Sequence, residues 1–187
     1  MAINESKLNE FLGKAVGDLG AALSATLVLV GDRLGLYKEL ARGAVTSAEL
    51  AQRTGTNERY VREWLGNQGA SGYVQYDAAN RKWSMTPEQA LCLADPAGPV
   101  DMPGAYNIVE ATFHALGRTL ENFKSGKGME WGEHHPCLFH GTERFFRAGY
   151  NANWFPPGCP RSRASSTSSS EARALLTSAA VTARAPC

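Results

Sequence analysis

The sequence predicts a mainly α-helical protein built around a winged helix-turn-helix, with extra helices before and after that motif. Two observations lead to this fold class. Residues 46–72 hold two short amphipathic helix patterns separated by a glycine, and residues 73–85 hold two β-prone runs joined by a turn-like segment. A helix, a tight turn, a second helix and a hairpin, in that order, make up a winged helix-turn-helix.

Residues that begin and end helices mark the two motif helices. Thr46 or Ser47 can cap the first, because a hydroxyl oxygen there accepts a hydrogen bond from an otherwise unpaired backbone N–H. Gly55 stands where a helix-ending residue with positive φ is favoured. Thr56 or Asn57 can cap the second helix. The apolar residues of that helix recur at helical spacing and are Tyr60, Val61, Trp64 and Leu65.

The wing is predicted directly after the second helix, which Gly72 ends. Residues 73–76 and 82–85 alternate in the way that is typical of half-buried strands, and residues 77–80 between them have turn composition. The two runs therefore predict an antiparallel hairpin.

Residues 4–41 predict two helices, with a bend or a close helix contact at Gly17 and Gly20, since glycine weakens a helix interior. The second of them, residues 21–34, is apolar nearly all round, which is typical of a helix buried on several sides. Its apolar residues are Leu23, Leu27, Val30 and Leu34 on one side and Ala22, Ala25 and Val28 on the other. A homodimer through the N-terminal helices is expected to cover this surface. The alternative, to which we give equal weight, is cover by other helices of the same chain.

Three more helices are predicted after the wing. Thr86-Pro87 favours the start of a short helix, residues 102–124 form a long one, and residues 141–153 form the last. Residues 129–140, MEWGEHHPCLFH, are predicted as a loop. The organisation that follows is an N-terminal and winged-helix domain at residues 1–95, a helical connector and lid-like segment at 96–153, and a tail at 154–187.

The loop at residues 129–140 is dense in side chains that can do chemistry. His134, His135, Cys137 and His140 are of zinc-ligand type, but adjacent histidines point apart and no partner cluster exists elsewhere, so no metal site is predicted. We favour a pocket loop whose His and Glu side chains offer hydrogen bonds or acid/base groups. An aromatic-rich loop packed on the long helix is the alternative. The substrate-pocket candidates are Trp131, Glu133, His134, His135, Phe146 and Tyr150, and no catalytic residue is assigned.

Net charge bears on whether the motif reads DNA. Arg59 and Arg62 on the second motif helix are the residues that would reach a major groove. A groove reader needs a basic surface, yet 19 Lys and Arg stand against 18 Asp and Glu, and Glu58 and Glu63 lie beside the two arginines. A DNA-binding regulator is therefore the second-ranked function, and a structural module that dimerises or covers a substrate ranks first.

Cysteine usage and hydropathy bear on the compartment. The four cysteines are scattered without CxxC spacing, which gives no disulfide framework. The apolar run at residues 25–30 is too short to span a bilayer, and no basic segment of signal-peptide type precedes it. We expect a cytoplasmic protein with reduced thiols and no membrane association.

Four segments together resemble bacterial S-adenosylmethionine-dependent methyltransferases that carry a winged-helix domain ahead of a Rossmann-like catalytic domain. They are ATLVLVGDRLGLYKELA, TSAELAQRTGTNERYVREWLGNQGASGYV, EWGEHHPC and HGTERFFRAGYNAN, and they span nearly all of residues 1–153. The resemblance implies a winged-helix part that dimerises and encloses a small-molecule methyl acceptor. It also implies S-adenosylmethionine as the cofactor of the full-length family. The family's DxGxGxG-type cofactor loop is missing from the chain, so no cofactor is expected for this chain and it is predicted to be inactive by itself.

From Trp154 onward the composition changes to Ser, Ala, Arg and Pro, which predicts a disordered tail. These residues have GC-rich codons, as expected of a coding region read out of frame. With one base restored before codon 154, residues 174–183 (ALLTSAAVTA) are compatible with Val-Ala-Asp-Val-Gly-Cys-Gly-His-Gly, a strand that runs into a glycine-rich nucleotide loop. We therefore expect a methyltransferase cut by a frameshift before its catalytic domain. A non-catalytic remnant for dimerisation or substrate binding is a third possibility.

Overall fold

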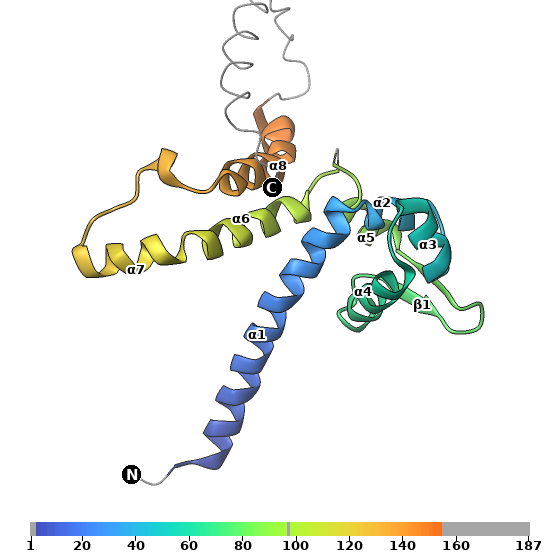
Figure 1. The fold of residues 1–187 in the computed structure, drawn as a ribbon, viewed down its shortest axis with the longest axis horizontal. Coiled ribbons are helices and arrows are strands. Elements are labelled where there is room, and N and C mark those ends of the chain that lie inside the picture. Colours follow the sequence, from blue (N-terminus) through green and yellow to red (C-terminus); the bar gives the residue numbers. More distant parts are fainter. Residues whose placement is uncertain (1–2, 97, 155–187) are drawn as a thin grey trace, which may run out of the picture.

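The computed structural model describes residues 3–96 and 98–154, with side chains described as far as residue 150. A long helix, α1 (Glu5–Arg33), stands between two groups of elements (Figure 1). One group is the winged helix-turn-helix, and the other is made by α6, α7 and α8. The tail that was predicted to be disordered and out of frame lies outside the described residues except for Trp154, which is the last residue of a helix, and the domain boundary at residue 95 stays a prediction.

The winged helix-turn-helix is confirmed. It consists of α2 (Leu36–Leu40), α3 (Ser47–Thr54), α4 (Glu58–Ala70), β1 (Gln75–Asp77) and β2 (Lys82–Ser84). Thr46 caps α3 in a capping box with Glu49, Gly55 follows with φ 65°, and the side chain of Asn57 accepts a hydrogen bond from the backbone of Arg59. The predicted signals for helix ends therefore lie where the structure uses them.

The wing is shorter than predicted, with three residues in each strand. β1 and β2 pair antiparallel with Tyr76 opposite Trp83, and their rings lie 4.5 Å apart between centroids. Val45 extends this small sheet, because its N–H and C=O both bond to the backbone of Trp83, at N···O distances of 2.9 and 2.7 Å. The hairpin is thus fastened to the strand-like residue that precedes α3.

The core joins α1 to the winged helix-turn-helix. Tyr37 and Trp64 meet edge to face, with ring centroids 5.1 Å apart. Trp64 Nε1–H donates to the carbonyl oxygen of Leu27, and the Tyr37 hydroxyl donates to Gln68. Gly31 of α1 lies against both rings, since a Cβ there would be 2.5 Å from Trp64 and 2.6 Å from Tyr37. The buried apolar residues of this core include Val28, Leu36, Leu40, Leu50, Val61, Leu65 and Val74.

The predicted division of residues 4–34 into two helices, with a break near Gly17 and Gly20, is wrong. α1 runs unbroken through Gly17 and Gly20, and neither glycine has another atom within 4 Å of where its Cβ would be. A cost of about 1 kcal/mol for each glycine does not stop a helix whose neighbours are alanine and leucine. Burial also differs from the prediction, because Leu23 and Val30 are exposed whereas Val28 is fully buried.

The helices after the wing start and end differently from the prediction. α5 (Pro87–Leu93) begins at the Thr86 capping box as expected. The long helix divides at Ala115 into α6 (Met102–His114) and α7 (Leu116–Ser125). Threonine hydroxyls on both sides of this break bond to carbonyls four residues earlier, an arrangement that bends helices.

The last helix, α8 (Pro136–Trp154), starts five residues before the predicted Gly141. The predicted loop is accordingly shorter and contains a single 3-10 turn, η1 (Trp131–Glu133). Proline is well suited to the first helical turn, which accounts for the earlier start. Gly141 instead lets α8 approach α6, because a Cβ there would lie 2.6 Å from the carbonyl oxygen of Gly104.

Candidate functional site

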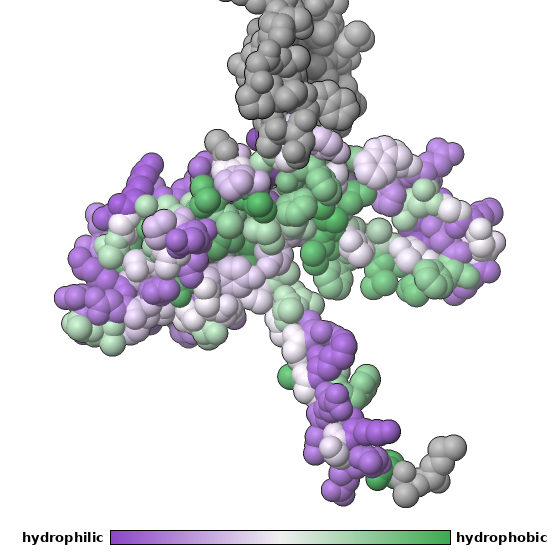
Figure 2. Space-filling model, turned by 180° about the vertical axis from the view of Figure 1, so that it is seen from behind, coloured by the Kyte–Doolittle hydropathy of each residue, from purple (hydrophilic) through white to green (hydrophobic). Residues whose placement is uncertain are grey.

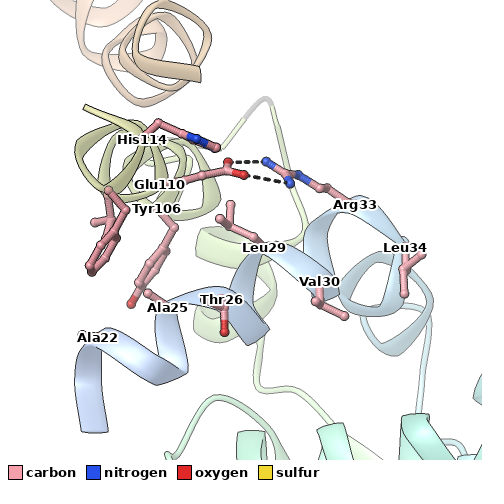
Figure 3. Close-up of a pocket in the computed structure, with 12 residues that line it drawn as sticks. Ala22, Ala25, Thr26, Leu29, Val30, Arg33, Leu34, Tyr106, Glu110 and His114 are labelled. Carbon is pink, nitrogen blue, oxygen red and sulfur yellow. Dashed lines mark hydrogen bonds and ion pairs between the residues drawn. The ribbon is translucent and has the colours of Figure 1, made fainter. Parts of the chain in front are cut away.

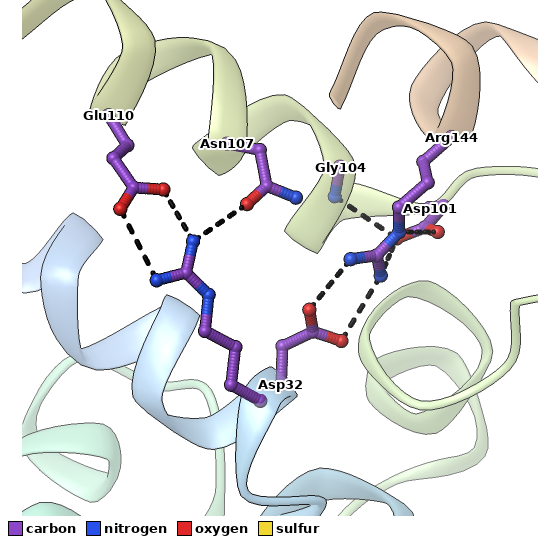
Figure 4. Close-up of polar contacts among 7 residues, drawn as sticks. Asp32, Asp101, Gly104, Asn107, Glu110 and Arg144 are labelled. Atoms are coloured by element: carbon purple, nitrogen blue, oxygen red, sulfur yellow. Dashed lines mark hydrogen bonds and ion pairs between the residues drawn. The ribbon is translucent and has the colours of Figure 1, made fainter. Parts of the chain in front are cut away.

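The C-terminal end of α1, the N-terminal end of α6 and the middle of α8 meet at Arg144. Its guanidinium donates two hydrogen bonds to Asp32 of α1, at 2.7 and 3.1 Å, and two to Asp101, at 2.8 and 3.0 Å (Figure 4). Asp101 also caps α6, because its side chain accepts a hydrogen bond from the backbone N–H of Gly104. The hydrogen bonds to Asp32, and then those to Asp101, raise the pKa of Arg144, so this cation is permanent.

A second arginine, Arg33, joins α1 to α6 next to this cluster. Its guanidinium pairs with both carboxylate oxygens of Glu110 and donates to Asn107 Oδ1 at 3.3 Å (Figure 4). The hydrogen bonds from Arg33 hold the pKa of Glu110 below its ordinary value. Asn107 is buried, and its amide nitrogen, Nδ2, has no hydrogen-bond partner among the described residues.

An apolar groove lies between α1 and α6, with a volume of about 560 Å³ (Figure 3). Arg33 and Glu110 face each other at one side of it, and the Tyr106 ring enters from α6. The hydroxyls of Tyr106 and Tyr73 are 2.5 Å apart, and burial together with this contact raises the pKa of Tyr106 to about 12. The groove therefore offers apolar walls and neutral hydroxyls at physiological pH. Its apolar lining includes Ala22, Ala25, Leu29, Val30, Val109 and Phe113.

The predicted substrate-pocket residues are divided among several surroundings. Trp131 and Tyr150 line a shallow hollow of about 350 Å³ together with Phe139. Glu133 pairs with Arg118 of α7 at 3.0 Å, which occupies the carboxylate. The ring of His134 lies against Trp131, with centroids 5.7 Å apart. Their role in binding a substrate stays a prediction.

The other two candidates are Phe146, which lies on α8, and His135, which directly precedes that helix. The His135 ring stacks on His114 of α6, with centroids 4.0 Å apart, and its Nδ1 accepts a hydrogen bond from the backbone N–H of Cys137. Phe146 packs on Phe145, with ring centroids 5.1 Å apart. The structure thus brings Trp131, His134 and Tyr150 near one hollow, sets Phe146 beside Tyr150 with ring centroids 6.2 Å apart, and places His135 away from them, against α6.

The comparisons with known proteins follow this geometry. The family model of the Rv2258c-like winged HTH domain matches residues 21–95. Residues 21–95 are thus similar to this domain, and the match confirms the expected winged helix-turn-helix. No curated protein sequence matches the chain.

Solved structures with the same fold are methyltransferases in several cases. The mitomycin 7-O-methyltransferase MmcR is 19% identical, with a TM-score of 0.56, and the match covers 78% of this chain and 46% of that one. PigF with SAH is 14% identical, with a TM-score of 0.56 and coverage of 74% and 44%. CalO1, a methyltransferase in calicheamicin biosynthesis in its SAH-bound form, is 18% identical, with a TM-score of 0.51 and coverage of 83% and 50%. The chain spans about half the length of these structures, and at these identities the likeness establishes a shared fold.

The two arginines considered for DNA binding lie on α4 of the Rv2258c-like domain. Arg62 faces Glu58, with an N···O distance of 3.9 Å, and Glu58 accepts a hydrogen bond from Ser47 at 2.7 Å. Arg59 is exposed. One of the two cations is therefore partly neutralised by its own helix, and whether the domain binds DNA stays untested.

The histidine-rich segment next to the Rv2258c-like domain does not assemble a ligand set. Within residues 3–96 and 98–150, no three His, Cys, Asp or Glu side chains are placed to hold one metal ion. Cys137 is buried, whereas His140 is exposed and lines a different cavity. Sequence reasoning missed Asp32, Arg33, Asn107 and Arg144, since each is a common residue type without a local motif. No local signal could have found them, because which positions face a helix partner is decided by the packing of helices that are far apart in the sequence.

Proposed function

We propose that this chain is the dimerising and substrate-enclosing part of an S-adenosylmethionine-dependent methyltransferase that acts on a small molecule. The shared fold with MmcR, PigF and CalO1 supports the enzyme class. The SAH in two of those structures supports the cofactor of the complete enzyme. The observation that carries the proposal is the exposed apolar surface of α1, which is continuous with the α1–α6 groove.

The projecting half of α1 has no partner within the described chain. Residues 5–21 are all exposed, and Figures 1 and 2 show this part of the helix standing clear of the other elements, with hydrophobic side chains among hydrophilic ones. Leu12, Val16, Leu19 and Leu23 recur at spacings of four, three and four residues and are 48–65% exposed. A stripe of this period is typical of a helix that packs on another helix.

The helices α6 and α7 present a matching stripe. Val109, Phe113, Leu116, Leu120 and Phe123 recur at spacings of four and three residues, and all are exposed. Large contiguous apolar surfaces are rare on monomeric soluble proteins and mark interaction sites. We infer that α1 of one subunit lies against α6 and α7 of a second copy, so that the α1–α6 groove becomes enclosed and can hold a small apolar acceptor.

A membrane is the competing explanation for α1. Among the described helices it is the one with the length and apolar composition of a membrane span, by sequence measures that a packing helix also meets. Lys7, Glu10, Lys14 and Asp18 lie on its projecting half, and ionised groups at such positions are costly in hydrocarbon. These charges favour a protein partner over a bilayer.

Light scattering during size-exclusion chromatography tests the assembly. We expect the unmodified chain to elute as a dimer at micromolar concentration and Leu23→Asp to elute as a monomer, because the change places an unpaired charge in the contact. Ala21→Asp is the matched control, since Ala21 is exposed on the opposite side of α1. If the unmodified chain is soluble without detergent and elutes as a monomer, the dimer proposal is contradicted.

Calorimetry tests the enzyme class. We propose that the frame downstream of residue 153, with one base restored, encodes the glycine-rich cofactor loop, since backbone N–H groups of such loops approach a nucleotide closely. The restored, longer product is expected to bind S-adenosylmethionine with a micromolar Kd, whereas the present chain binds it at least a hundredfold more weakly. A restored frame that stops at once, or that binds no cofactor, refutes this part of the proposal.

A further inference from the structure

A second cavity, separate from the apolar groove, has a polar lining. It lies between the C-terminal end of α1, α2, the connection before α6, and α8, and its volume is about 390 Å³. That volume is within the range of small-ligand sites. The residues that matter for its chemistry are Asp32, Lys38, Asp101, Asn107 and Arg144.

One buried donor in this cavity lacks a partner. Asn107 is only 2% exposed, and its Nδ2 has no hydrogen-bond partner among the described residues. Its Oδ1 is held by Arg33, which fixes the orientation of the amide. In Figure 4 the amide nitrogen points away from Arg33, toward the side where Arg144 and Gly104 lie. A buried N–H left unpaired costs free energy, which an acceptor at this position, a ligand oxygen or an ordered water, recovers.

A second donor lines the same cavity. Lys38 projects from α2, and it makes no hydrogen bond or ion pair with any residue that the structure describes. Its ammonium group has three N–H donors and no acceptor. Lys38 is exposed to solvent and needs no partner for folding, but together with Asn107 Nδ2 it gives the cavity two uncommitted donors, which suits an acceptor-only ligand.

The fixed charges around these donors select among acceptors. Asp32 and Asp101 line the cavity together with three arginines, each of which already pairs with a carboxylate: Arg144 with the two aspartates, Arg33 with Glu110 and Arg147 with Glu143. A dianion such as phosphate would face two carboxylates with one uncommitted cation among the lysine and arginine side chains of the lining, Lys38. A carboxylate carries a single charge and two acceptor oxygens, which suits one amide and one ammonium.

We propose that this cavity binds the carboxylate group of a small organic molecule, with Asn107 Nδ2 and Lys38 Nζ as its donors. All of the residues involved lie between positions 32 and 147, so the proposal depends on neither a catalytic domain nor a cofactor. It is also separate from the apolar stripe of α1. Failure of either the methyltransferase or the dimer proposal therefore leaves this one standing.

A nuclear magnetic resonance titration of the unmodified chain tests the site. Sodium acetate is the probe, sodium chloride at equal ionic strength is the salt control, and the assigned side-chain amide of Asn107 is the reporter. We expect a saturable shift with acetate and none with chloride. Lys38→Gln is expected to weaken acetate binding roughly tenfold, as the loss of one charge-assisted hydrogen bond predicts.

A matched variant and a second reporter complete the design. Lys124→Gln removes an exposed lysine of α7 that pairs with Glu121, and it should leave the acetate affinity unchanged. Asn107→Ala, followed at the backbone amide of Gly104, should abolish saturation; if that variant does not fold, the Lys38→Gln comparison decides alone. An Asn107 amide that does not move, that moves equally with chloride, or that binds acetate equally well in Lys38→Gln overturns the proposal. Tighter binding of inorganic phosphate than of acetate also overturns it.

Discussion

Replacing Arg144 with methionine removes the guanidinium that pairs with both Asp32 and Asp101. Methionine keeps most of the aliphatic stem, so the change isolates the guanidinium. The side chains of Arg144, Asp32 and Asp101 are 16%, 13% and 6% exposed, which places the cluster among largely buried ion pairs. Two carboxylates would then lie close together without the guanidinium that both of them pair with.

The expected cost follows from these contacts. Removing one partner of a buried ion pair typically costs about 3–5 kcal/mol, mostly because the remaining charge is left without compensation. Asp101 keeps its hydrogen bond from the backbone N–H of Gly104, which reduces the penalty. We therefore expect the lower end, a loss of about 3 kcal/mol in the free energy of unfolding. The loss should concentrate on α8, which Arg144 joins to α1.

Urea unfolding followed by circular dichroism measures the change, and limited proteolysis locates it. Trypsin should cleave α8 of Arg144→Met before it cleaves the Rv2258c-like domain. Arg147→Met is the control, because Arg147 lies on the same helix but pairs with Glu143 at the surface, where such pairs contribute little. A loss below 1 kcal/mol for Arg144→Met, or an equal loss for both variants, would refute the reasoning.

Three further outcomes are expected. Gly31→Ala should cost about 2 kcal/mol in urea unfolding, because its Cβ would overlap the Tyr37 and Trp64 rings; Gly20→Ala, which has open space around it, should instead stabilise the helix by about 0.5–1 kcal/mol. The free energy of unfolding should fall as the pH is lowered, in part because of Glu110. The pKa of Glu110 is lowered in the folded chain, so its stabilising contribution is complete above the unfolded value of 4.5 and is lost as the pH falls through the folded pKa. Glu110→Gln should flatten that dependence, and an unchanged pH profile would contradict it. Gel shift at physiological salt should show weak, salt-sensitive DNA binding, since the net charge is +1; a competitor-resistant site would favour the regulator.

The winged helix-turn-helix could be predicted because its signals are local. Thr46 and Asn57 begin helices, Gly55 ends one with positive φ, and the alternation around Trp83 marks a strand. Each of these preferences acts within about four residues of the chain. They hold whatever the rest of the molecule does, which is why this part of the fold followed from the sequence.

Burial on α1 could not be predicted in the same way. The periodicity indicated that its apolar side chains would be covered, yet Leu23 is exposed and Val28 is buried. Which side of an apolar helix faces the core depends on the elements that pack against it, and the winged helix-turn-helix covers only the C-terminal part of α1. The division of the long helix at Ala115 had a similar origin, in side-chain bonds that propensity does not report.

By itself the sequence determined a winged helix-turn-helix, since caps, glycines and strand alternation depend on neighbouring residues. Only the tertiary structure decided the polar centre. Arg144 is 112 positions from Asp32 and 43 positions from Asp101 in the sequence. The amide nitrogen of Asn107 is left without a hydrogen-bond partner among the described residues because α1 and α8 bury it. Contacts over such separations depend on how helices cross, and no local preference of the chain specifies a crossing.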